Sequence, residues 1–494
     1  MRYFLLLSVC VVAICGLVYE LIAATIASYL LGDSITHFST IIGTYLFSMG
    51  IGSYLSRFVR ESVLRAFIRI ELIVACLGGF SALILYALFP LLESLYIPLY
   101  GLVVLVGTGV GAEIPLLMRI LKEDMEFSDL VSTVLSFDYI GALLASILFP
   151  LVCIPMFGIV KTSLIFGVLN AIIAFLLVVF AREKLRGFRF EVITSSIVIF
   201  ALCSALVMAD DVVRAAETAS YNEQVILSKS SPYQRLVVTR SGNDTRLYLN
   251  GQLQFSSRDE YRYHEALVHV GLGSVLNPEN VLILGGGDGF AAREVLRYDT
   301  IKSIVLVDLD PAVVELFKSN KGLSSLSSNA LSDKRLEIVH EDAFSWIRKT
   351  NLKFDFIIID LPDPTNFSLG KLYSDYFYRN VSNLLNEDGL IVVQATSPLF
   401  ARESFWMIAH TLQSVGLIIK PYHLYVPSFT EWGFILGGKK NYTIKPPPKD
   451  LKFLTEEIYP SLFYFPRDME EVQTDIQSLN TQSLVSLYSR EWNF

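Results

Sequence analysis

The sequence predicts a protein in two parts, in which a multi-pass helical membrane domain precedes a soluble α/β domain. Of its 494 residues, 53% are hydrophobic and only 18% are charged, which is unusual for a fully soluble protein. The long apolar runs end near Met208, and beyond Asp210 short apolar strands alternate with charged helices. We expect three domains: transmembrane helices at 1–210, a small β-sheet at 211–270, and a doubly wound α/β domain with a C-terminal tail at 271–494.

The first half contains seven stretches that could each cross a bilayer, for which a helix needs roughly 20 apolar residues. They cover about 4–31, 35–56, 66–91, 95–120, 130–155, 161–181 and 191–209. The first stretch is too long for a signal peptide, lacks a small-residue cleavage site, and is followed by further spans. We therefore expect a multi-pass protein of the cell membrane, with the lipid bilayer as its surroundings.

Basic residues gather in three of the connections between these spans: Arg57, Arg60, Arg65 and Arg69, then Arg119 and Lys122, then Arg182, Lys184, Arg186 and Arg189. The positive-inside rule places these connections in the cytoplasm. With seven spans, the soluble half would then lie on the opposite side. The chemistry inferred below favours a cytoplasmic soluble half, and one miscounted span, such as the weak last one, would remove the conflict.

Three carboxylates lie within the expected spans, at Glu20, Glu113 and Asp138. Ionisable groups inside a membrane are costly and often functional, so they could line a path for a cation. Alternatively, each is hydrogen-bonded locally within the bundle. The net charge of −8 argues against a nucleic-acid partner, and none of the five cysteines has metal-ligand spacing, so no metal site is expected.

The soluble half begins with short strands that alternate polar and apolar residues, over about 222–257. Gly242-Asn243-Asp244 and Asn250-Gly251 between them are turn signals, which predicts a small antiparallel sheet. A helix follows at about 259–272.

From residue 280 onward, apolar strands alternate with helices. The strands read NVLILGG (280–286), SIVLVDLD (303–310), LEIVHED (336–342), FDFIIID (354–360) and GLIVVQA (389–395). This alternation predicts a parallel sheet covered on both faces, in a Rossmann-like, methyltransferase-type doubly wound fold. Ligands of such sheets bind beyond the carboxyl ends of the strands.

The candidate binding residues follow three of these strands. The loop GGGDG (285–289) after the first strand lets a ligand approach the backbone, although it lacks the G-x-G-x-x-G phosphate pattern. Asp308 ends the second strand, where an acidic side chain commonly accepts from ribose hydroxyls, and Asp342 ends the third, where it could accept from an adenine amino group. Acidic strand ends suit an adenosine with a cationic attachment better than a phosphate. For Asp308 and Asp342 the alternative is helix N-capping.

The fourth strand ends on Asp360, and Asp363 follows within a segment hinged by Pro362 and Pro364. An attacking amine has a pKa near ~10 and arrives protonated. A carboxylate can hold the ammonium ion and accept a proton as a C–N bond forms. The alternative is a simple Asp-Pro turn, which explains Asp363 but not Asp360.

From Tyr221 to Lys439 the chain resembles the spermidine synthase family, the polyamine aminopropyltransferases, in its membrane-spanning branch. The similarity rests on SPYQRL, LNGQLQFSSRDEYRYHEALVH, LGGGDGFAAREVLR, VDLDP, EDAFSWI and DLPDP, which occur in the family's order. It implies transfer of an aminopropyl group from decarboxylated S-adenosylmethionine to putrescine, giving spermidine and 5′-methylthioadenosine. It also implies that no cofactor is needed beyond this co-substrate, and that the chain forms a homo-oligomer.

The resemblance assigns five residues to the donor. Gln234 corresponds to the glutamine near the thioadenosine, and Asp288 to the aspartate that faces the amine of the aminopropyl arm, at the junction with the acceptor. Asp308 stands where a glutamate commonly binds the ribose. Asp342 corresponds to the adenine contact, and Ala343 replaces the usual glycine beside it.

Five residues are likewise assigned to the acceptor. Gln254 corresponds to the glutamine that follows a conserved turn of the family, and Tyr263 and His264 to a pair at the polyamine site. Asp360 corresponds to the catalytic base and Asp363 to a second amine contact.

Two departures from the family pattern concern the acceptor. The segment after Asp363 continues PTNFSLGKLYS instead of P-x-G-P, and Phe429 in VPSFTEWGF replaces an amine-contacting tyrosine. The resemblance therefore specifies the donor more firmly than it specifies putrescine.

Two other functions compete with aminopropyl transfer: an S-adenosylmethionine-type methyltransferase acting on a membrane substrate, and a non-catalytic polyamine sensor or transporter. The pair Asp360 and Asp363 favours catalysis over sensing. Asp288 favours a decarboxylated donor, because its negative charge would repel a carboxylate on the same arm.

Overall fold

The chain divides into two compact units, 1–225 and 226–494, and each is described by itself. The structure is a computed structural model that describes residues 2–31, 35–60, 62–89, 91–92, 94–122, 125–183, 185, 187–221 and 223–492. Of the basic residues used above to orient the spans, Lys184 and Arg186 lie outside these ranges. The finer division into three domains stays a prediction.

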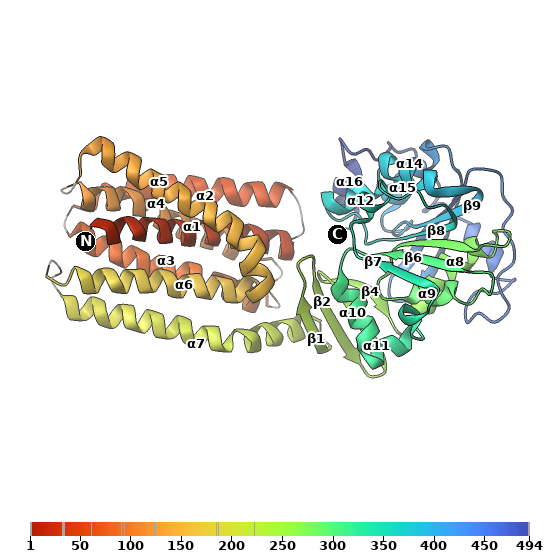
Figure 1. Cartoon of the computed structure of the whole chain (residues 1–494), viewed down its shortest axis with the longest axis horizontal. Helices are drawn as coiled ribbons and strands as arrows, with labels where there is room; N and C mark the ends of the chain where they lie inside the picture. The colour runs from red at the N-terminus through yellow and green to blue at the C-terminus, as the bar shows by residue number, and fades with distance from the viewer. Residues whose placement is uncertain are drawn as a thin grey trace. The chain divides into compact units, whose positions relative to one another are not determined.

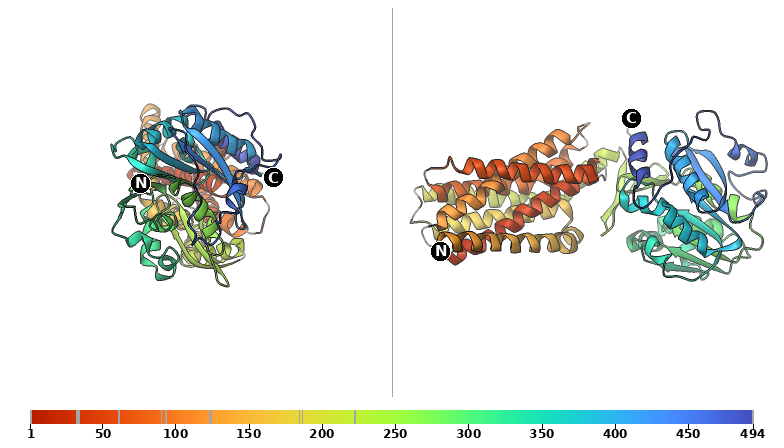
Figure 2. Two further views of the ribbon diagram at one scale, coloured as in Figure 1. Left: turned by 90° about the vertical axis from the view of Figure 1, so that its right-hand side faces the viewer. Right: turned by 90° about the horizontal axis from the view of Figure 1, so that it is seen from above.

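The first unit is a bundle of helices that lie side by side (Figures 1 and 2). It comprises α1 (Arg2–Leu31), α2 (Ile35–Ser56), α3 (Val63–Leu88), α4 (Tyr96–Leu121), α5 (Phe127–Leu148), α6 (Ile154–Phe180) and α7 (Phe188–Tyr221). Helix α1 packs against α2, α3, α4, α5 and α6, so it forms the centre of the bundle. Helix α7 continues past residue 210, where we expected the membrane domain to end.

The chain changes direction between α5 and α6 through a connection that is itself helical. A π-helical turn, Phe149–Cys153, follows α5 and leads directly into α6. Pro150 and Pro155 lack the backbone N–H that a regular helix needs, which disturbs the α-helical pattern here. The bend itself lies at Gly158, whose φ of 72° is strained for any residue with a side chain.

Among the described residues, five helical stretches are long and apolar enough to cross a membrane. They are Leu5–Ser28, Val63–Leu88, Tyr96–Leu121, Phe127–Phe180 and Phe188–Tyr221. The stretch Phe127–Phe180 contains both α5 and α6, whereas α2, which is rich in Ser, Thr and Gly, is not among the five. The helical architecture is as expected, and the count of seven spans stays a prediction.

Glycines bring α2 and α4 into backbone contact. A Cβ atom at Gly52 of α2 would lie 1.9 Å from the carbonyl oxygen of Thr108, and one at Gly111 of α4 would lie 2.0 Å from that of Met49. Small residues at such crossings allow close packing of membrane helices. The glycine-rich stretch of α4 therefore has a structural role.

The second unit begins with an antiparallel sheet in the order β1-β2-β3-β4. Its strands are β1 (Gln224–Ser230), β2 (Arg235–Ser241), β3 (Asp244–Leu249) and β4 (Gln252–Ser256). Asn250 and Gly251, with φ of 50° and 82°, form the two-residue turn between β3 and β4. Helix α8 (Glu260–Leu272) follows and leads into the larger sheet.

The larger sheet has seven strands in the order β10-β11-β9-β8-β5-β6-β7. The strands are β5 (Asn280–Gly285), β6 (Ser303–Val307), β7 (Leu336–Val339), β8 (Phe354–Asp360), β9 (Leu385–Gln394), β10 (Ile418–Val426) and β11 (Thr430–Gly438). Strands β5 to β9 pair in parallel, and β10 and β11 add an antiparallel edge.

Alternate residues of the central strands contribute to two separate hydrophobic cores. Val281 and Ile283 of β5 pack with α8, α9 (Phe290–Val295) and α10 (Pro311–Ser319) on one face. Leu282 and Leu284 belong to the core on the other face, formed with α12 (Ala343–Trp346), α14 (Asp375–Leu384), α15 (Arg402–Ser414) and α16 (Ser483–Trp492). The sheet is thus covered on both sides, as its continuous apolar strands predict.

Parallel pairing places the carboxyl ends of β8, β5, β6 and β7 at one edge of the sheet. Asp360 lies opposite Gly285 in the register of β8 and β5. The loop 285–289, Asp308 and Asp342 follow the neighbouring strands. Residues that are far apart in the sequence therefore lie in a row of acidic groups along one edge of the sheet.

Candidate active site

Asp360, the last residue of β8, is held by a tyrosine from α8. The Tyr263 hydroxyl donates to Asp360 Oδ1 at 2.6 Å. Burial raises the pKa of Asp360 above its usual range, although the charge of His264 and the hydrogen bond from Tyr263 oppose this rise. One carboxylate oxygen is thus fixed by Tyr263, which leaves Oδ2 for another partner.

The glycine loop after β5 fits tightly around two of the aspartates. A Cβ atom at Gly285, where φ is 86°, would lie 2.0 Å from the carbonyl oxygen of Asp360. A Cβ atom at Gly287 would lie 2.5 Å from Asp308 Oδ2, which accepts from the Gly287 backbone N–H at 3.0 Å. Side chains at these two positions would therefore displace both aspartates.

Asp288 and His264 share the electrostatic environment of Asp360. Burial raises the pKa of Asp288 to about 6; the charge of Asp360 adds to this rise and that of His264 opposes it. The pKa of His264 is raised as well: burial alone would lower it, but the hydrogen bond and charge of Glu260 outweigh burial. These groups titrate as a cluster, so a change in one shifts the others.

A buried ion-pair network orients His264. Its Nδ1 lies 2.9 Å from Glu260 Oε2, and both Glu260 oxygens accept from Arg293 at 2.9 Å. The bidentate geometry with Arg293 fixes the plane of the Glu260 carboxylate. Hence the position of His264 depends on α8 and α9 together.

Asp308 receives only backbone hydrogen bonds among the described residues. It accepts from Gly287 N at 3.0 Å and from Asp310 N at 2.9 Å, and burial raises its pKa to about 6. The N-cap of α10 is Asp310 instead, which accepts from Ala312 N. The capping alternative therefore does not apply to Asp308.

Gln234 reaches this region through Asp310. Its Nε2 donates to Asp310 Oδ2 at 2.9 Å, and the Ser231 hydroxyl donates to the same oxygen at 2.7 Å. The small sheet is thereby joined to the loop after β6. Gln254, in contrast, donates only to the backbone oxygens of Gln252 and Leu253, so the described contacts do not connect it to the other predicted residues.

Asp342 caps α12, accepting from Phe344 N at 3.0 Å, as the capping alternative proposed. Its other oxygen lies 2.7 Å from the Lys371 ammonium, which comes from the segment after Asp363. Ala343 is buried behind it at the start of α12. One oxygen of Asp342 thus has a cationic partner that the sequence did not suggest.

Asp363 is buried, with only 8% of its surface exposed. It accepts from Gln394 Nε2 at 3.1 Å and from the Tyr488 hydroxyl at 2.8 Å. Burial raises the pKa of Asp363, and these two hydrogen bonds oppose the rise. Asp363 is therefore a positioned carboxylate and not an exposed turn residue.

Aromatic rings pack around the ring of Tyr263. The ring centroid of Tyr263 lies 5.9 Å from that of Phe429 and 5.1 Å from that of Phe434. Trp432 packs on Phe429 at 5.1 Å. Phe429, which departs from the family pattern, therefore lies beside Tyr263, where it provides an apolar face instead of a hydroxyl.

Residues 260–446 match a family described as the Spermine/spermidine synthase domain. "Polyamine aminopropyltransferase" of Leptospira interrogans is 47% identical over 497 residues, which cover 100% of this chain and 99% of that protein. "Polyamine aminopropyltransferase 2" of Ralstonia nicotianae is 48% identical over 501 residues, with 99% and 98% covered. "Polyamine aminopropyltransferase" of Oceanobacillus iheyensis is 38% identical over 494 residues, with 98% and 96% covered.

This chain belongs to the polyamine aminopropyltransferase family. The similarity to these aminopropyltransferases extends over the helical unit as well as the soluble unit, because nearly the whole length of each relative is matched. The helical unit is therefore part of an architecture that these relatives share. It is not an addition confined to this chain.

Several residues at this aminopropyltransferase site were not predicted from the sequence. Gln394 ends strand β9 at the same edge as the aspartates, and its position after GLIVVQ could have identified it. Lys371 and Tyr488 had no such signal: Tyr488 lies 125 residues from Asp363 in a tail outside the matched family region. Only the folded chain brings them to the carboxylates.

Proposed function

We propose that this chain transfers the aminopropyl group of decarboxylated S-adenosylmethionine to putrescine, giving spermidine and 5′-methylthioadenosine. The observation that carries this proposal is the buried Asp360 carboxylate, with Oδ1 hydrogen-bonded to Tyr263 at 2.6 Å and Asp288 in the same electrostatic cluster. A buried carboxylate next to a second one suits a site that binds two ammonium groups and removes a proton.

The transfer begins with a proton. The ammonium group of the acceptor binds Asp360, which accepts one proton and leaves a neutral amine. The nitrogen lone pair then attacks the methylene carbon bonded to the sulfonium. The C–N bond forms as the C–S bond breaks, and the electron pair of that bond stays on sulfur, giving a neutral thioether. The product leaves as a secondary ammonium ion, and Asp360 returns its proton to solvent.

The donor is held by groups that recognise its separate parts. Asp288 binds the ammonium group of the aminopropyl arm, and Asp308 accepts from the ribose hydroxyls. Asp342 accepts from the adenine amino group, with Ala343 beside the ring. Gln234 orients the thioadenosine through Asp310. The backbone hydrogen bonds of Asp308, from Gly287 and Asp310, support this role because they fix its carboxylate before the donor arrives.

The acceptor extends from Asp360 towards Asp363, which binds its distal ammonium group. Gln394 and Tyr488 hold the Asp363 carboxylate in place. We assign Tyr263 and His264 to the wall beside the attacking nitrogen, and Gln254 to a contact with the polyamine chain. Phe429 packs against the methylene groups, which favours an extended diamine over a more polar amine.

Product analysis separates this function from its competitors. The purified chain is incubated with putrescine and either decarboxylated S-adenosylmethionine or S-adenosylmethionine, and the nucleoside products are quantified by mass spectrometry. We expect methylthioadenosine and spermidine from the decarboxylated donor. S-adenosylhomocysteine as the main product would identify a methyltransferase, and binding of putrescine without either product would identify a sensor or transporter.

The multi-pass location in the cell membrane, the lipid bilayer as partner, and a homo-oligomeric state belong to the same proposal. Five apolar stretches support the membrane location. We place the catalytic unit in the cytoplasm, where the donor is made, although seven spans with the basic connections described above favour the opposite side. A reporter enzyme fused near Glu217, active on only one side of the membrane, decides between the two orientations.

A further inference from the structure

Four polar residues meet inside the helical unit. They are Tyr19 of α1, Glu71 of α3, Glu113 of α4 and Asn170 of α6, each with at most 3% of its surface exposed. Both carboxylate oxygens of Glu71, Oε1 of Glu113, the Tyr19 hydroxyl and Oδ1 of Asn170 have no hydrogen-bond partner among the described residues. The cluster therefore contains several buried oxygen atoms that lack a hydrogen-bond partner among the described residues.

The cluster lies well inside the bundle. Glu71 follows Val63, the first residue of α3, by eight residues, and Glu113 precedes Leu121, the last residue of α4, by the same number. Eight residues of α-helix span about 12 Å. Each glutamate therefore lies about 12 Å along its helix from the end that carries Arg65 and Arg69 in α3 or Arg119 in α4.

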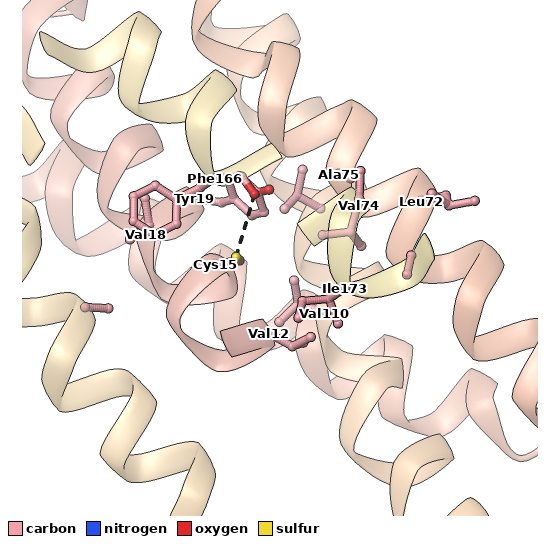
Figure 3. Close-up of a cluster of buried hydrophobic side chains, with 14 of the residues drawn as sticks. Val12, Cys15, Val18, Tyr19, Leu72, Val74, Ala75, Val110, Phe166 and Ile173 are labelled. Carbon is pink, nitrogen blue, oxygen red and sulfur yellow. Dashed lines mark hydrogen bonds between the residues drawn. The ribbon is translucent and has the colours of Figure 1, made fainter. Parts of the chain in front are cut away.

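Close packing fixes the arrangement. A Cβ atom at Gly78 of α3 would lie 2.7 Å from the Tyr19 ring, so only a glycine leaves room for this tyrosine. Asn170 Nδ2 donates to the backbone oxygen of Glu71 at 3.2 Å, which uses one of its two N–H donors, while Oδ1 has no partner among the described residues. One turn earlier on α6, Cys15 Sγ donates to the Phe166 carbonyl oxygen, as Figure 3 shows.

The surroundings of the cluster are apolar. In Figure 3 the neighbouring side chains of α1, α3, α4 and α6 include Val12, Leu72, Val110 and Ile173. An unpaired carboxylate in such surroundings is costly, and two of them close enough to interact, as Glu71 and Glu113 are, cost more. A cation between them would remove this cost.

The protein itself does not supply that cation. Arg65 and Arg69, the basic residues on the same helix as Glu71, pair with Glu191 at 3.9 and 2.8 Å. No ion pair joins a described Lys, Arg or His to Glu71 or Glu113. The described side chains therefore give Glu71 and Glu113 no positive charge, so each carboxylate is either protonated or paired with a cation from outside the described chain.

We propose that Glu71 and Glu113, with Tyr19 and Asn170, form an intramembrane binding site for the ammonium group of a primary alkylamine. An ammonium ion carries three N–H donors, which can satisfy both carboxylates and a third acceptor at once. The face of the Tyr19 ring offers a further favourable contact for a cation. This site is separate from the transfer site of the soluble unit and goes beyond the proposed function.

A narrow hollow borders the cluster at Tyr19 and supports this choice of ligand. It is lined by Tyr19 and Tyr45 together with aliphatic residues such as Leu85, Leu99 and Val103, which suit a methylene chain. Its volume is about 10 Å³, close to the space of a single water molecule. An alkylamine therefore enters only when the two tyrosine side chains move.

The first test measures equilibrium binding of radiolabelled putrescine to the full chain in lipid nanodiscs. Asp360→Asn and Asp363→Asn are present throughout, so that the transfer site does not contribute. We expect saturable binding that weakens about tenfold or more in Glu71→Gln and in Glu113→Gln. The matched control is Asp129→Asn, an exposed carboxylate in the first turn of α5, which should bind as the parent does. Equal binding in all three variants would overturn the proposal.

The second test needs no substitution in the cluster, so it remains informative if those variants fail to fold. A membrane-permeable carbodiimide adds to buried protonated carboxyl groups to give a stable N-acylurea, which peptide mass spectrometry locates. We expect labelling of Glu71 or Glu113 that putrescine prevents and the same concentration of NaCl does not. Absent labelling, or labelling that putrescine leaves unchanged, refutes the site, and equal protection by NaCl assigns it to a metal cation. Because no transfer is measured, failure here is distinct from failure of the proposed function.

Discussion

At the scale of single residues, the role of Asp360 can be tested with the least change to the structure. Asp360→Asn keeps the size of the side chain and an acceptor for the Tyr263 hydroxyl, so the fold should persist. It removes the proton acceptor and one charge that holds the amine. We expect kcat to fall about 10²–10⁴-fold, the usual contribution of a general base.

Steady-state kinetics with saturating donor and acceptor measures this change. Asp388→Asn is the matched control, because Asp388 is an exposed aspartate whose only ion pair among the described residues is with Lys440 at 2.9 Å. It should leave kcat unchanged. Turnover of Asp360→Asn within about threefold of the parent would exclude Asp360 as the base, since that loss is far below the usual contribution.

The acid limb of the pH profile should reflect Asp288. Its pKa is raised to about 6, chiefly by burial, so the carboxylate is charged above this pH and neutral below it. The neutral form cannot hold the ammonium group of the donor arm. We therefore expect kcat/KM for the donor to decrease as the pH falls through about 6. In Asp288→Asn kcat/KM should be low throughout, and the pH dependence that remains should be that of Asp308, whose pKa burial also raises to about 6. The charges of His264 and Asp360 both act on the Asp288 carboxylate, so the three groups titrate together. A parent profile that stays flat down to pH 5 would exclude this role for Asp288.

The aspartates could be predicted because each lies at a fixed place in a regular pattern, the end of a parallel strand. Asp308, Asp342 and Asp360 all follow apolar runs, and parallel strands gather such ends at one edge. Nothing local marks Lys371 or Tyr488, which reach the site from segments that pack against it in three dimensions. Their positions depend on long-range contacts, which periodicity does not report.

At the scale of secondary-structure elements, the small sheet and the parallel strands β5 to β9 were predicted because they are short, apolar and separated by turns, whereas the antiparallel edge strands β10 and β11 were not. Boundaries were less certain where no turn residue ends an element. Helix α7 continues from Phe188 to Tyr221, beyond the expected end at 209, because Asp210 and Asp211 continue the helix instead of breaking it. The Asp210 carboxylate also pairs with Lys161 of α6 at 2.7 Å.

The C-terminal helix α16 supplies Tyr488 to the acceptor side, which makes the helix part of the proposed site. Tyr488→Phe should remove the hydrogen bond to Asp363 without disturbing the packing of the ring. A hydrogen bond to a charged group contributes about 1.5–3 kcal/mol, so KM for putrescine should rise roughly tenfold or more while KM for the donor stays the same.

Initial-rate measurements with each substrate varied in turn distinguish this effect from a general loss of structure. Ser486→Ala on the same helix serves as the control, because Ser486 is exposed and its hydroxyl donates to the Ser483 backbone oxygen, away from Asp363. Equal increases of KM for both substrates in Tyr488→Phe would indicate a disturbed fold and contradict a specific role of Tyr488 at the acceptor.

At the scale of the whole molecule, the helical unit shows how much depends on packing. The sequence drew attention to Glu20, Glu113 and Asp138, but not to Glu71, which is buried in the bundle and interacts electrostatically with Glu113, as Asp138 also does. A carboxylate in an apolar helix can be recognised from the sequence, whereas the face it shares with other helices cannot. The partners of Glu113 therefore became apparent only from the arrangement of α1, α3, α4 and α6.

The division into two compact units leads to a prediction about their independence. The soluble unit has its own cores on both faces of the sheet, and every residue assigned to transfer lies within 226–494. The soluble half is long enough for its own core, so a protein that starts at Glu217 should be soluble and fold alone. Its kcat/KM for putrescine should stay within about threefold of that of the full chain. Circular dichroism and size-exclusion chromatography verify folding, and initial rates with several diamines measure the activity. A truncated protein that is folded yet nearly inactive with every diamine would show that the helices complete the acceptor site, next to the unusual segment PTNFSLGKLYS.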